Sequence, residues 1–459
     1  MMVKRVAFAA ARAMLAASAT LVLANAHAVH AETLMDVVQS AQENDPEYRA
    51  ARFQNQADAE ATRQAWARFK PQVRASAATN LTRQEIISSD NSVYDIGKNS
   101  YPDYGYEVRI DQSLFDFQNW AGLRAARTLR RQSSAQFEVA KQDLLLRVVE
   151  RYFTLLAAQE AASAARAEVR AIDAHVKLVS SKYARGAVRY AELLDVQARY
   201  QMVLAKQIQT ESGIRDAAIA IKEVTGVYPG SLDDLSDAMT VATVTPDEPQ
   251  HWVDLAVQNN PRIIAAAHAA RRGDQLIAVE KAAGYPTLNL QMFHDRRKTE
   301  GSLFGGGSDI SQLGARVRLD VPISAGGQVR SRVNEARALY EKAVAESVRT
   351  SRGVERQTLL SIDSINTAAA RVGALKASLD AQEKVVQQLN AAFRAGVSAS
   401  VDYLDSERDL FQARAEYLRA RYDFALNTVR LRHALGLLSI DDIAELSGKM
   451  APVAPSDGG

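Results

Sequence analysis

The chain has 459 residues, with 56 lysines and arginines against 54 aspartates and glutamates, so its formal net charge is +2. It contains no cysteine, which excludes disulfides, thiolate-ligated zinc sites and acylation at a lipobox cysteine. The small excess of positive charge belongs to the first residues, so it gives no support to nucleic-acid binding.

Residues 1–31 have the pattern of a secretory signal peptide. Lys4, Arg5 and Arg12 come before an apolar run at 14–23, and small residues follow. The run is shorter than the ~20 residues of a membrane-spanning helix, so we expect cleavage rather than anchoring. Loss of these three positive charges changes the net charge from +2 to −1. The remaining chain has no apolar run of spanning length, so we expect it to be soluble in the periplasm or embedded by some route other than a helix.

The rest of the chain contains one unit twice. An Asn-Asp-Pro sequence ends at Pro46 and an Asn-Asn-Pro sequence at Pro261, and a second proline follows each at the same spacing. Further on, residues 183–226 align without a gap with residues 393–436, from an aromatic residue to a closing glycine. A repeat of about two hundred residues is far longer than the ~20–50 residues of ordinary solenoid repeats.

These matches divide the chain into five segments: a signal peptide at 1–31, a first repeat at 32–226, a linker at 227–250, a second repeat at 251–436 and a polar tail at 437–459. We expect the tail to be largely disordered, because it is polar and contains proline and glycine. We expect the linker to wrap around the middle of the helices.

Each repeat is predicted to begin with an amphipathic helix, at about 34–69 and 252–283, broken at the Asn-Pro sequence because proline restricts the preceding residue. After the second proline the hydrophobic period changes to two, which predicts a strand. A polar loop (about 85–103 and 295–311) and a second alternating strand follow. The apolar faces of these second strands are Tyr104, Tyr106, Val108, Ile110 and Leu114 in the first repeat, and Leu313, Ala315, Val317, Leu319 and Val321 in the second.

Alternation with charges on one face only fits two environments. One is the half-buried sheet of a soluble protein, and the other is a set of strands between lipid and water. The strands alone favour the soluble sheet. In the membrane case the lipid-facing and water-facing sets would be Val108, Ile110, Val317 and Leu319 against Arg109 and Arg318.

The remainder of each repeat is predicted to be a long helical hairpin that turns at Gly186 or Gly396. Without proline between 119 and 182, the first helix would measure ~95 Å. Residues recur at coiled-coil spacing, every seven residues at Val148, Leu155, Ala162, Val169, Val176 and Tyr183. In the second repeat, steps of four and three alternate at Leu375, Leu379, Gln382, Val386, Leu389 and Phe393, which are apolar except for Gln382. A hairpin this long cannot bury its stripe against a compact core, so we expect an assembly.

An assembly would also close the strands if they lie in lipid. Four strands per chain leave two open edges, and unpaired backbone groups are costly in hydrocarbon. Two chains would give eight strands and three chains twelve, and the strand count does not choose between them.

The hairpin turns carry a resemblance to a known family. An aromatic residue, a glycine three positions later and a Val-Asp-x-Leu-Asp type of pattern occur at 183–197 and 393–405. With the order of elements over 34–436, they resemble the TolC-type outer-membrane efflux channels. The resemblance implies a mainly α fold with transmembrane β-strands. It further implies a homotrimer in which a twelve-stranded β-barrel is continued by a periplasmic α-helical barrel with a closed tip.

The resemblance also implies function and partners. The chain would lie in the outer membrane of a Gram-negative bacterium, among outer-membrane lipid, as the exit duct of type I protein secretion or multidrug efflux. A periplasmic adaptor and an inner-membrane transporter of the ABC, RND or MFS type would supply cargo and energy. The rival class is a soluble periplasmic coiled-coil scaffold.

No enzymatic activity, metal or cofactor is expected. The histidines beyond the leader (His175, His251, His268, His294 and His433) are scattered without metal-ligand spacing. The glycine-rich stretch at 302–308 lacks the Gly-Lys-Ser/Thr ending of a phosphate loop.

The chain departs from the family at the tip and at one strand–helix joint. Ser398 stands where relatives have a basic latch residue, and the aromatic latch residue, Phe393, lacks a hydroxyl. The glycine pair after the fourth strand has no counterpart in the first repeat. The latch candidates implied by the resemblance are Tyr183, Arg185, Arg189, Glu192, Phe393 and Ser398.

Asp402 and Asp405 are the strongest candidates for a functional site. Spaced i, i+3, they lie on one face of the helix that follows the second turn. The residues alone favour a capping role and a favourable interaction with the helix dipole. The resemblance favours two rings of three carboxylates at the periplasmic gate, which would select cations.

Overall fold

The computed structural model describes residues 32–88, 90, 96–236, 239–246, 248–301, 306–395, 397–398 and 400–451. The predicted signal peptide and residues 452–459 lie outside the described residues. The chain forms two compact units, and both units draw on both sequence repeats. The described residues of unit 1 fall within Met1–Arg49, Gln142–Pro249 and Leu359–Gly459, and those of unit 2 within Ala50–Lys141 and Gln250–Thr358.

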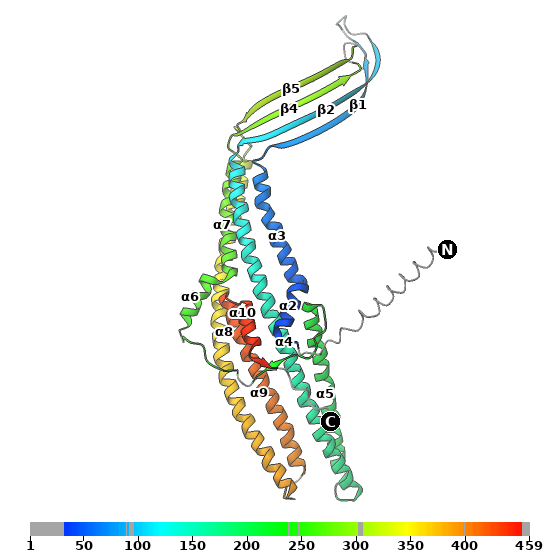
Figure 1. Cartoon of the computed structure of the whole chain (residues 1–459), viewed down its shortest axis with the longest axis vertical. Coiled ribbons are helices and arrows are strands. Elements are labelled where there is room, and N and C mark those ends of the chain that lie inside the picture. Colours follow the sequence, from blue (N-terminus) through cyan, green and yellow to red (C-terminus); the bar gives the residue numbers. More distant parts are fainter. Residues whose placement is uncertain are drawn as a thin grey trace, which may run out of the picture. The chain divides into compact units, whose positions relative to one another are not determined.

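The order of elements repeats as the duplicated sequence predicts (Figure 1). The first repeat contains α2 (Leu34–Asn44), α3 (Pro46–Ala67), β1 (Gln72–Ile86), β2 (Gly97–Phe115), α4 (Phe117–Ala184) and α5 (Tyr190–Thr225). The second contains α6 (Pro249–Asn259), α7 (Pro261–Ala282), β4 (Thr287–Thr299), β5 (Ser308–Asp320), α8 (Gln328–Arg394) and α9 (Ser400–Leu435). The short β3 (Asp234–Leu235) lies between the repeats, and α10 (Ile440–Ser447) and β6 (Met450–Ala451) follow them.

The Asn-Pro sequences break the first helix of each repeat, as predicted. Asp45 is extended (φ −60°, ψ 120°) ahead of Pro46, and Asn260 is extended (φ −67°, ψ 119°) ahead of Pro261. Asn260 also caps α7, because its side chain accepts a hydrogen bond from the Arg262 amide at 2.9 Å. The break therefore comes from the restriction that proline places on its predecessor.

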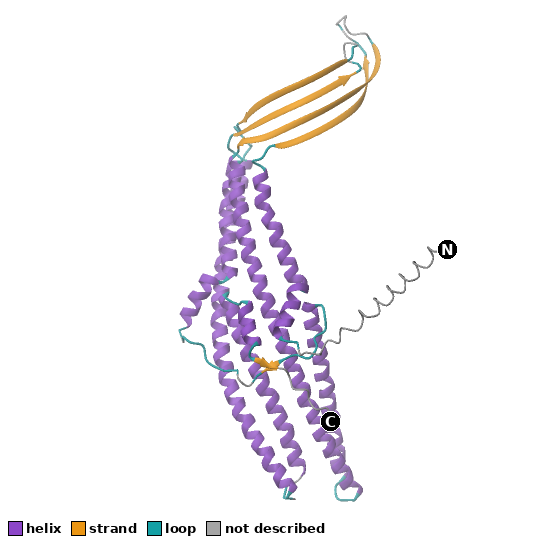
Figure 2. Cartoon of the chain, viewed as in Figure 1, coloured by secondary structure: helices purple, strands orange, loops and turns teal. Residues whose placement is uncertain are grey.

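The strands of unit 2 form one antiparallel sheet in the order β1-β2-β4-β5 (Figure 2). The strands extend further into the expected polar loops than the sequence predicted, since β2 begins at Gly97 and β5 at Ser308. Polar residues occupy these extensions, and they hide the alternation. β1 and β5 are the outer strands of this order, so each leaves one edge without a partner strand among the described residues. Both are exposed along almost their whole length.

The register places most of the predicted apolar residues on one face. Two are exceptions: a bulge between Ser113 and Phe115 puts Phe115, not Leu114, opposite Leu288, and Val321 lies beyond the end of β5. Residues directly opposite each other in an antiparallel pair share a face. Val108 and Ile110 lie opposite His294 and Met292, while Val317 and Leu319 lie opposite Leu290 and Leu288. Arg109 and Arg318 pair with Phe293 and Asn289 on the other face.

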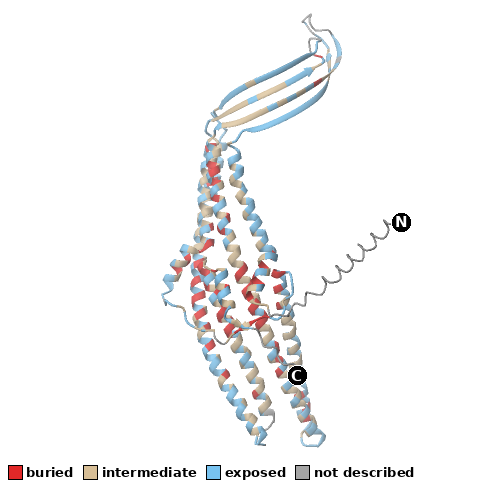
Figure 3. Cartoon of the chain, viewed as in Figure 1, coloured by how far each residue is buried: buried red, intermediate tan, exposed pale blue. Residues whose placement is uncertain are grey.

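The main core of unit 1 is built from α4, α5 and α9 together with α2 and α10. Val148, Leu155 and Ala162 of the seven-residue series are buried, whereas Val169 and Val176 are half-buried and Tyr183 is 42% exposed. Figure 3 shows buried residues gathered in the middle of the hairpins and fewer toward their turns. The second series behaves alike, with Leu379 buried and Phe393 42% exposed. In the first series, Val148 and Leu155 belong to the core that contains α2 and α10, and both series become more exposed toward the turns.

The expectation of a largely disordered tail is wrong for residues 440–451. Ser439 and Asp442 form a capping box at the start of α10, and Ile443 is fully buried in the unit 1 core. β6 then pairs with β3 of the linker. The helix forms because its two orphan amides are satisfied and its apolar face is covered.

The two strand–helix joints differ. A single residue, Asp116, separates β2 from α4, and its carboxylate accepts the Gln118 amide at 2.8 Å and the Asn119 amide at 3.3 Å. Seven residues separate β5 from α8, and they include Gly326 and Gly327 at φ +58° and +85°. Only glycine adopts such φ values readily. Among the described residues, no helix is long and apolar enough to cross a membrane.

Candidate functional site

The turn of the first hairpin joins α4 to α5. Gly186 has a φ of +71°, which a glycine supplies without steric cost. The ring of Tyr183 packs against Tyr190 with the centroids 5.6 Å apart, and Arg185 Nε donates to the Ser181 carbonyl at 3.2 Å. Arg189 is the N-cap of α5 and Glu192 lies in its first turn.

The turn of the second hairpin joins α8 to α9, and Gly396 lies outside the described residues. Phe393 stacks on Tyr403 with the centroids 5.9 Å apart and the planes 8° apart. The Tyr403 hydroxyl donates to Glu407 at 2.5 Å, and this bond raises the pKa of Tyr403. An aromatic pair thus braces each turn.

Four of the latch candidates make side-chain contacts within their own hairpins. Tyr183 meets Tyr190, Arg185 meets Ser181, Phe393 meets Tyr403 and the Ser398 hydroxyl donates to Asp402. These contacts brace the turns of a single chain, and the latch assignments remain predictions.

Asp402 and Asp405 are both exposed near the start of α9, where carboxylates favour the helix dipole. Asp402 lies in the first turn, and its Oδ2 accepts from the Ser398 hydroxyl at 3.3 Å. Asp405 binds Arg408 Nη1 at 3.1 Å, three residues along the helix. The pair of carboxylates is therefore on one face, but Asp405 carries a counter-ion from its own chain.

Arg408 is the residue that the sequence reasoning missed. It also binds Asp409 at 2.7 Å. That hydrogen bond, with the charges of Asp409, Asp405 and Glu168 of α4, raises the pKa of the Arg408 guanidinium. The i, i+3 spacing from Asp405 was the available signal.

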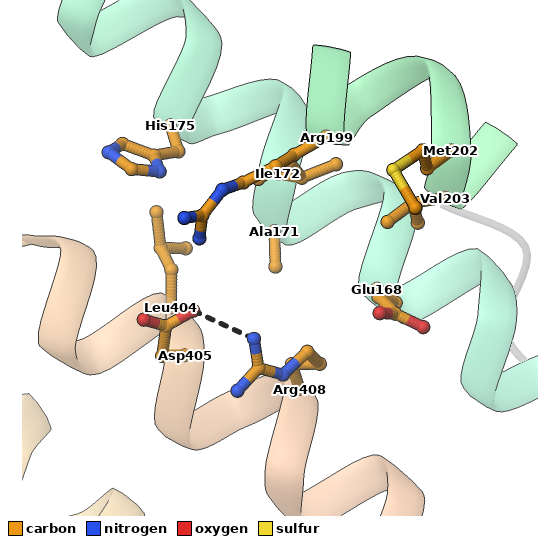
Figure 4. Close-up of a pocket in the computed structure, with 10 residues that line it drawn as sticks. All are labelled: Glu168, Ala171, Ile172, His175, Arg199, Met202, Val203, Leu404, Asp405 and Arg408. Atoms are coloured by element: carbon orange, nitrogen blue, oxygen red, sulfur yellow. Dashed lines mark hydrogen bonds and ion pairs between the residues drawn. The ribbon is translucent and has the colours of Figure 1, made fainter. Parts of the chain in front are cut away.

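Asp405 and Arg408 line a cavity of about 340 Å³ between α9 and the first hairpin (Figure 4). Ile172, Met202, Val203 and Leu404 give it apolar walls, while Glu168, His175 and Arg199 add charged or polar groups. Glu168 binds Lys206 at 2.8 Å and Arg199 binds Asp195 at 3.1 Å. Near the tip, charged side chains therefore occupy the space between the two hairpins of one chain.

A second group of ionisable residues lies in the unit 1 core. The Tyr152 hydroxyl donates to the Asp233 carbonyl at 2.8 Å, and the Tyr422 hydroxyl donates to Asp234 Oδ1 at 2.7 Å. Burial raises the pKa of Glu160, and the nearby charge of Asp234 adds to this effect. Burial, with the charge of Asp36, also raises the pKa of Asp233. In the part of the chain that the structure describes, no group of three histidine, cysteine, aspartate or glutamate residues could hold a metal ion.

Comparison with known proteins gives three findings. A family model described as "Outer membrane efflux protein" matches residues 37–227 and 252–437. Outer membrane protein TolC of Vibrio cholerae serotype O1 is 25% identical over 422 residues, which cover 92% of this chain and 94% of the relative. Proteases secretion protein PrtF of Dickeya chrysanthemi is 24% identical over 435 residues, with 93% of each chain covered.

A solved structure shows the same fold. The Campylobacter jejuni CmeC outer membrane channel superposes with a TM-score of 0.74 at 17% sequence identity, covering 92% of this chain and 90% of that one. Because both sequence repeats match the family and the folds superpose over almost their full length, the likeness extends to the whole duplicated unit.

Proposed function

This chain belongs to the outer membrane efflux protein family, and we propose that three copies form one exit channel gated by Asp402 and Asp405. The protein is an outer-membrane channel of efflux or type I secretion. The observation that carries this function is the family match to both repeats, which together span the sheet and both hairpins. A soluble scaffold would not account for that match.

The trimer and its partners are part of the proposal. The four-stranded sheet has two open edges, and three sheets would close into twelve strands. A periplasmic adaptor and an inner-membrane transporter would deliver the cargo to the tip. Type I secretion is the branch to test first, because PrtF, a relative matched over 93% of each chain, is named for protease secretion.

The proposed gate follows from the positions of the two carboxylates. In a trimer with α9 near the threefold axis, Asp402 and Asp405 would contribute six carboxylates to a narrow water path. Crowded like charges attract cations. Arg408 would neutralise part of this charge, since it binds Asp405 in each chain.

Single-channel recording in planar bilayers tests the gate. The double variant Asp402→Ala/Asp405→Ala is expected to lose cation preference and block by a multivalent cation added on the periplasmic side. Arg408→Ala is expected to change selectivity in the opposite direction, because it leaves Asp405 without its counter-ion. Both variants should assemble as the parent does.

Helix capping alone gives a different result. Loss of a cap would lower the free energy of unfolding by ~1 kcal/mol and leave ion selectivity unchanged. A double variant that conducts and is blocked like the parent would show that the gate lies elsewhere.

A further inference from the structure

Along the strands, one face of the sheet changes from mainly apolar residues to aromatic and basic residues. Three successive cross-strand rows are mainly apolar: Leu288 with Phe115 and Leu319, Leu290 with Val317, and Met292 with Ile110 and Ala315. Gln112, opposite Leu290, is the polar member of these rows. The next row contains Val108, His294 and Leu313, and His294 lies 3.3 Å from the Ser311 hydroxyl. This band occupies the part of the sheet nearest the joints to α4 and α8.

Two further rows on the same face combine aromatic and basic residues. Tyr106 lies opposite Arg296, and Tyr104 lies opposite Lys298, which in turn lies opposite Asp309. The four tyrosine, arginine and lysine side chains are exposed or half-buried, with Tyr104 48% exposed. They line, with Ala77, Thr79 and Asp309, a shallow cavity of about 470 Å³.

The charge of this cavity is positive. Arg296 binds Asp309 through two hydrogen bonds, at 3.0 and 2.8 Å, which hold the guanidinium in place. Lys298 is opposite the same carboxylate in register. Arg296 and Lys298 therefore share the single negative charge of Asp309. Guanidinium and ammonium groups beside tyrosine hydroxyls provide the donors that bind phosphate oxygens.

The position of this cavity along the strands matches the boundary of a membrane. Ten residues separate Leu288 from Lys298, and at ~3.3 Å per residue with a strand tilt of ~40° they rise ~25 Å, the height of the apolar band of a membrane barrel. Aromatic residues mark the opposite boundary, where Phe117 contacts Phe115 and Tyr285 with centroids 5.5 and 5.6 Å apart. Tyrosines at headgroup level are typical of such boundaries.

We propose that Arg296 and Lys298, with Tyr104 and Tyr106, bind a phosphate group of a lipid A type headgroup in the outer leaflet. The inference rests on the proposed function, because it requires this face to meet lipid and the hairpins to lie in the periplasm. The end of β2 and β4 that is remote from the helices then lies at the outer leaflet. The ligand is a phosphorylated glycolipid, whose negative charge complements the cavity.

Native mass spectrometry of the purified channel tests this, with diphosphoryl lipid A, its dephosphorylated form and inorganic phosphate as separate probes. The parent should retain diphosphoryl lipid A and should bind the dephosphorylated lipid at least about tenfold more weakly. The double variant Arg296→Gln/Lys298→Gln should show a similar loss of affinity for diphosphoryl lipid A, as expected for the removal of two basic residues at an anionic surface. Lys298→Gln alone, which keeps the Arg296–Asp309 pair, should show a smaller loss.

Arg316→Gln/Arg318→Gln is the matched control. It removes the same charge from the opposite face of the sheet, since these residues pair with Gln291 and Asn289. Equal loss in both double variants would overturn the site, as would retention of lipid A by the Arg296/Lys298 variant. Competition by millimolar inorganic phosphate would overturn the lipid source, because it would identify a site for the free anion.

Conductance in the same preparations separates this inference from the proposed function. The Arg296/Lys298 variant should conduct as the parent does. A parent that conducts but binds lipid A no better than its variant contradicts only the headgroup site, whereas a parent that forms no channel contradicts the proposed function.

Discussion

At the scale of single residues, Glu160 is a carboxylate that the fold partly removes from water. Burial is the main cause of its raised pKa, and Asp234 adds to it. The folded state therefore binds more protons than the unfolded state between the ordinary pKa of a glutamate and the raised value. Stability consequently falls as the pH rises through that interval and is regained as the pH falls.

Glu160→Gln is expected to raise the midpoint of thermal unfolding at pH 7, because the glutamine carries no charge to desolvate. It should also flatten the pH dependence just above the ordinary pKa of a glutamate. Circular dichroism melts of the detergent-solubilised protein at a series of pH values measure both effects. Glu383→Gln, at an exposed position, is the control and should change neither. A parent and a Glu160 variant with parallel pH profiles would disprove the assignment.

At the scale of elements, hydrophobic period was sufficient for the strands and the long helices. The alternation in β2 and β5 and the Asn-Pro breaks of α2 and α6 were predictable because local rules decide them. The seven-residue series predicted α4, but it could not predict where burial ends, since that depends on which segments cover the helix. α10 was missed although Ser439 and Asp442 form a local capping box, because the burial of its apolar face at Ile443 depends on the core of unit 1.

The candidate site could likewise be predicted only in part from the sequence. The shared face of Asp402 and Asp405 follows from helical spacing, and the structure has both on α9. The ion pair of Asp405 with Arg408 depends on rotamers, which spacing permits but does not require. The cavity between α9 and the first hairpin joins residues that are more than two hundred positions apart, and no local pattern identifies it.

The two faces of the sheet give a prediction for an element. Val317→Arg would place a charge on the face proposed to meet lipid, at a cost of ~2–4 kcal/mol near the bilayer midplane. Arg318→Ser, on the opposite face, should fold normally and alter conduction only. Heat-modified gel mobility and single-channel conductance of both variants provide the measurements. Equal tolerance at the two positions would mean that the lipid and water faces are assigned in reverse.

At the scale of the whole molecule, β1 and β5 each leave one edge without a partner strand in the described part of the chain, and in lipid such edges would need neighbours. Successive strands in the order β1-β2-β4-β5 are antiparallel, so β5 of one copy can continue the pattern with β1 of the next. Such a head-to-tail contact closes into a ring only at a fixed number of copies.

Introduced cysteines can count those copies, because the chain has no cysteine of its own. One cysteine replaces Ser76 in β1 and the second replaces, in turn, Gln312 and Arg316 on the matching face of β5. Oxidised samples on a non-reducing gel should form a ladder that ends at three chains. Chains with a single cysteine serve as the control and should give no such ladder. A ladder that ends at two chains would mean an eight-stranded ring instead.

The unequal joints between strand and helix make the two halves of the duplicated unit mechanically different. Asp116 is the one residue between β2 and α4, and its carboxylate accepts hydrogen bonds from the Gln118 and Asn119 amides of the first turn of α4. We therefore expect a rotation of this helix about its axis to twist the strand. The joint ahead of α8 contains a glycine pair at positive φ, so we expect it to be flexible and to let α8 turn while β5 keeps its position. In a threefold assembly, three stiff joints would alternate with three flexible joints. We therefore expect the second hairpin, which carries Asp402 and Asp405, to turn more easily about its joint to the sheet than the first hairpin does.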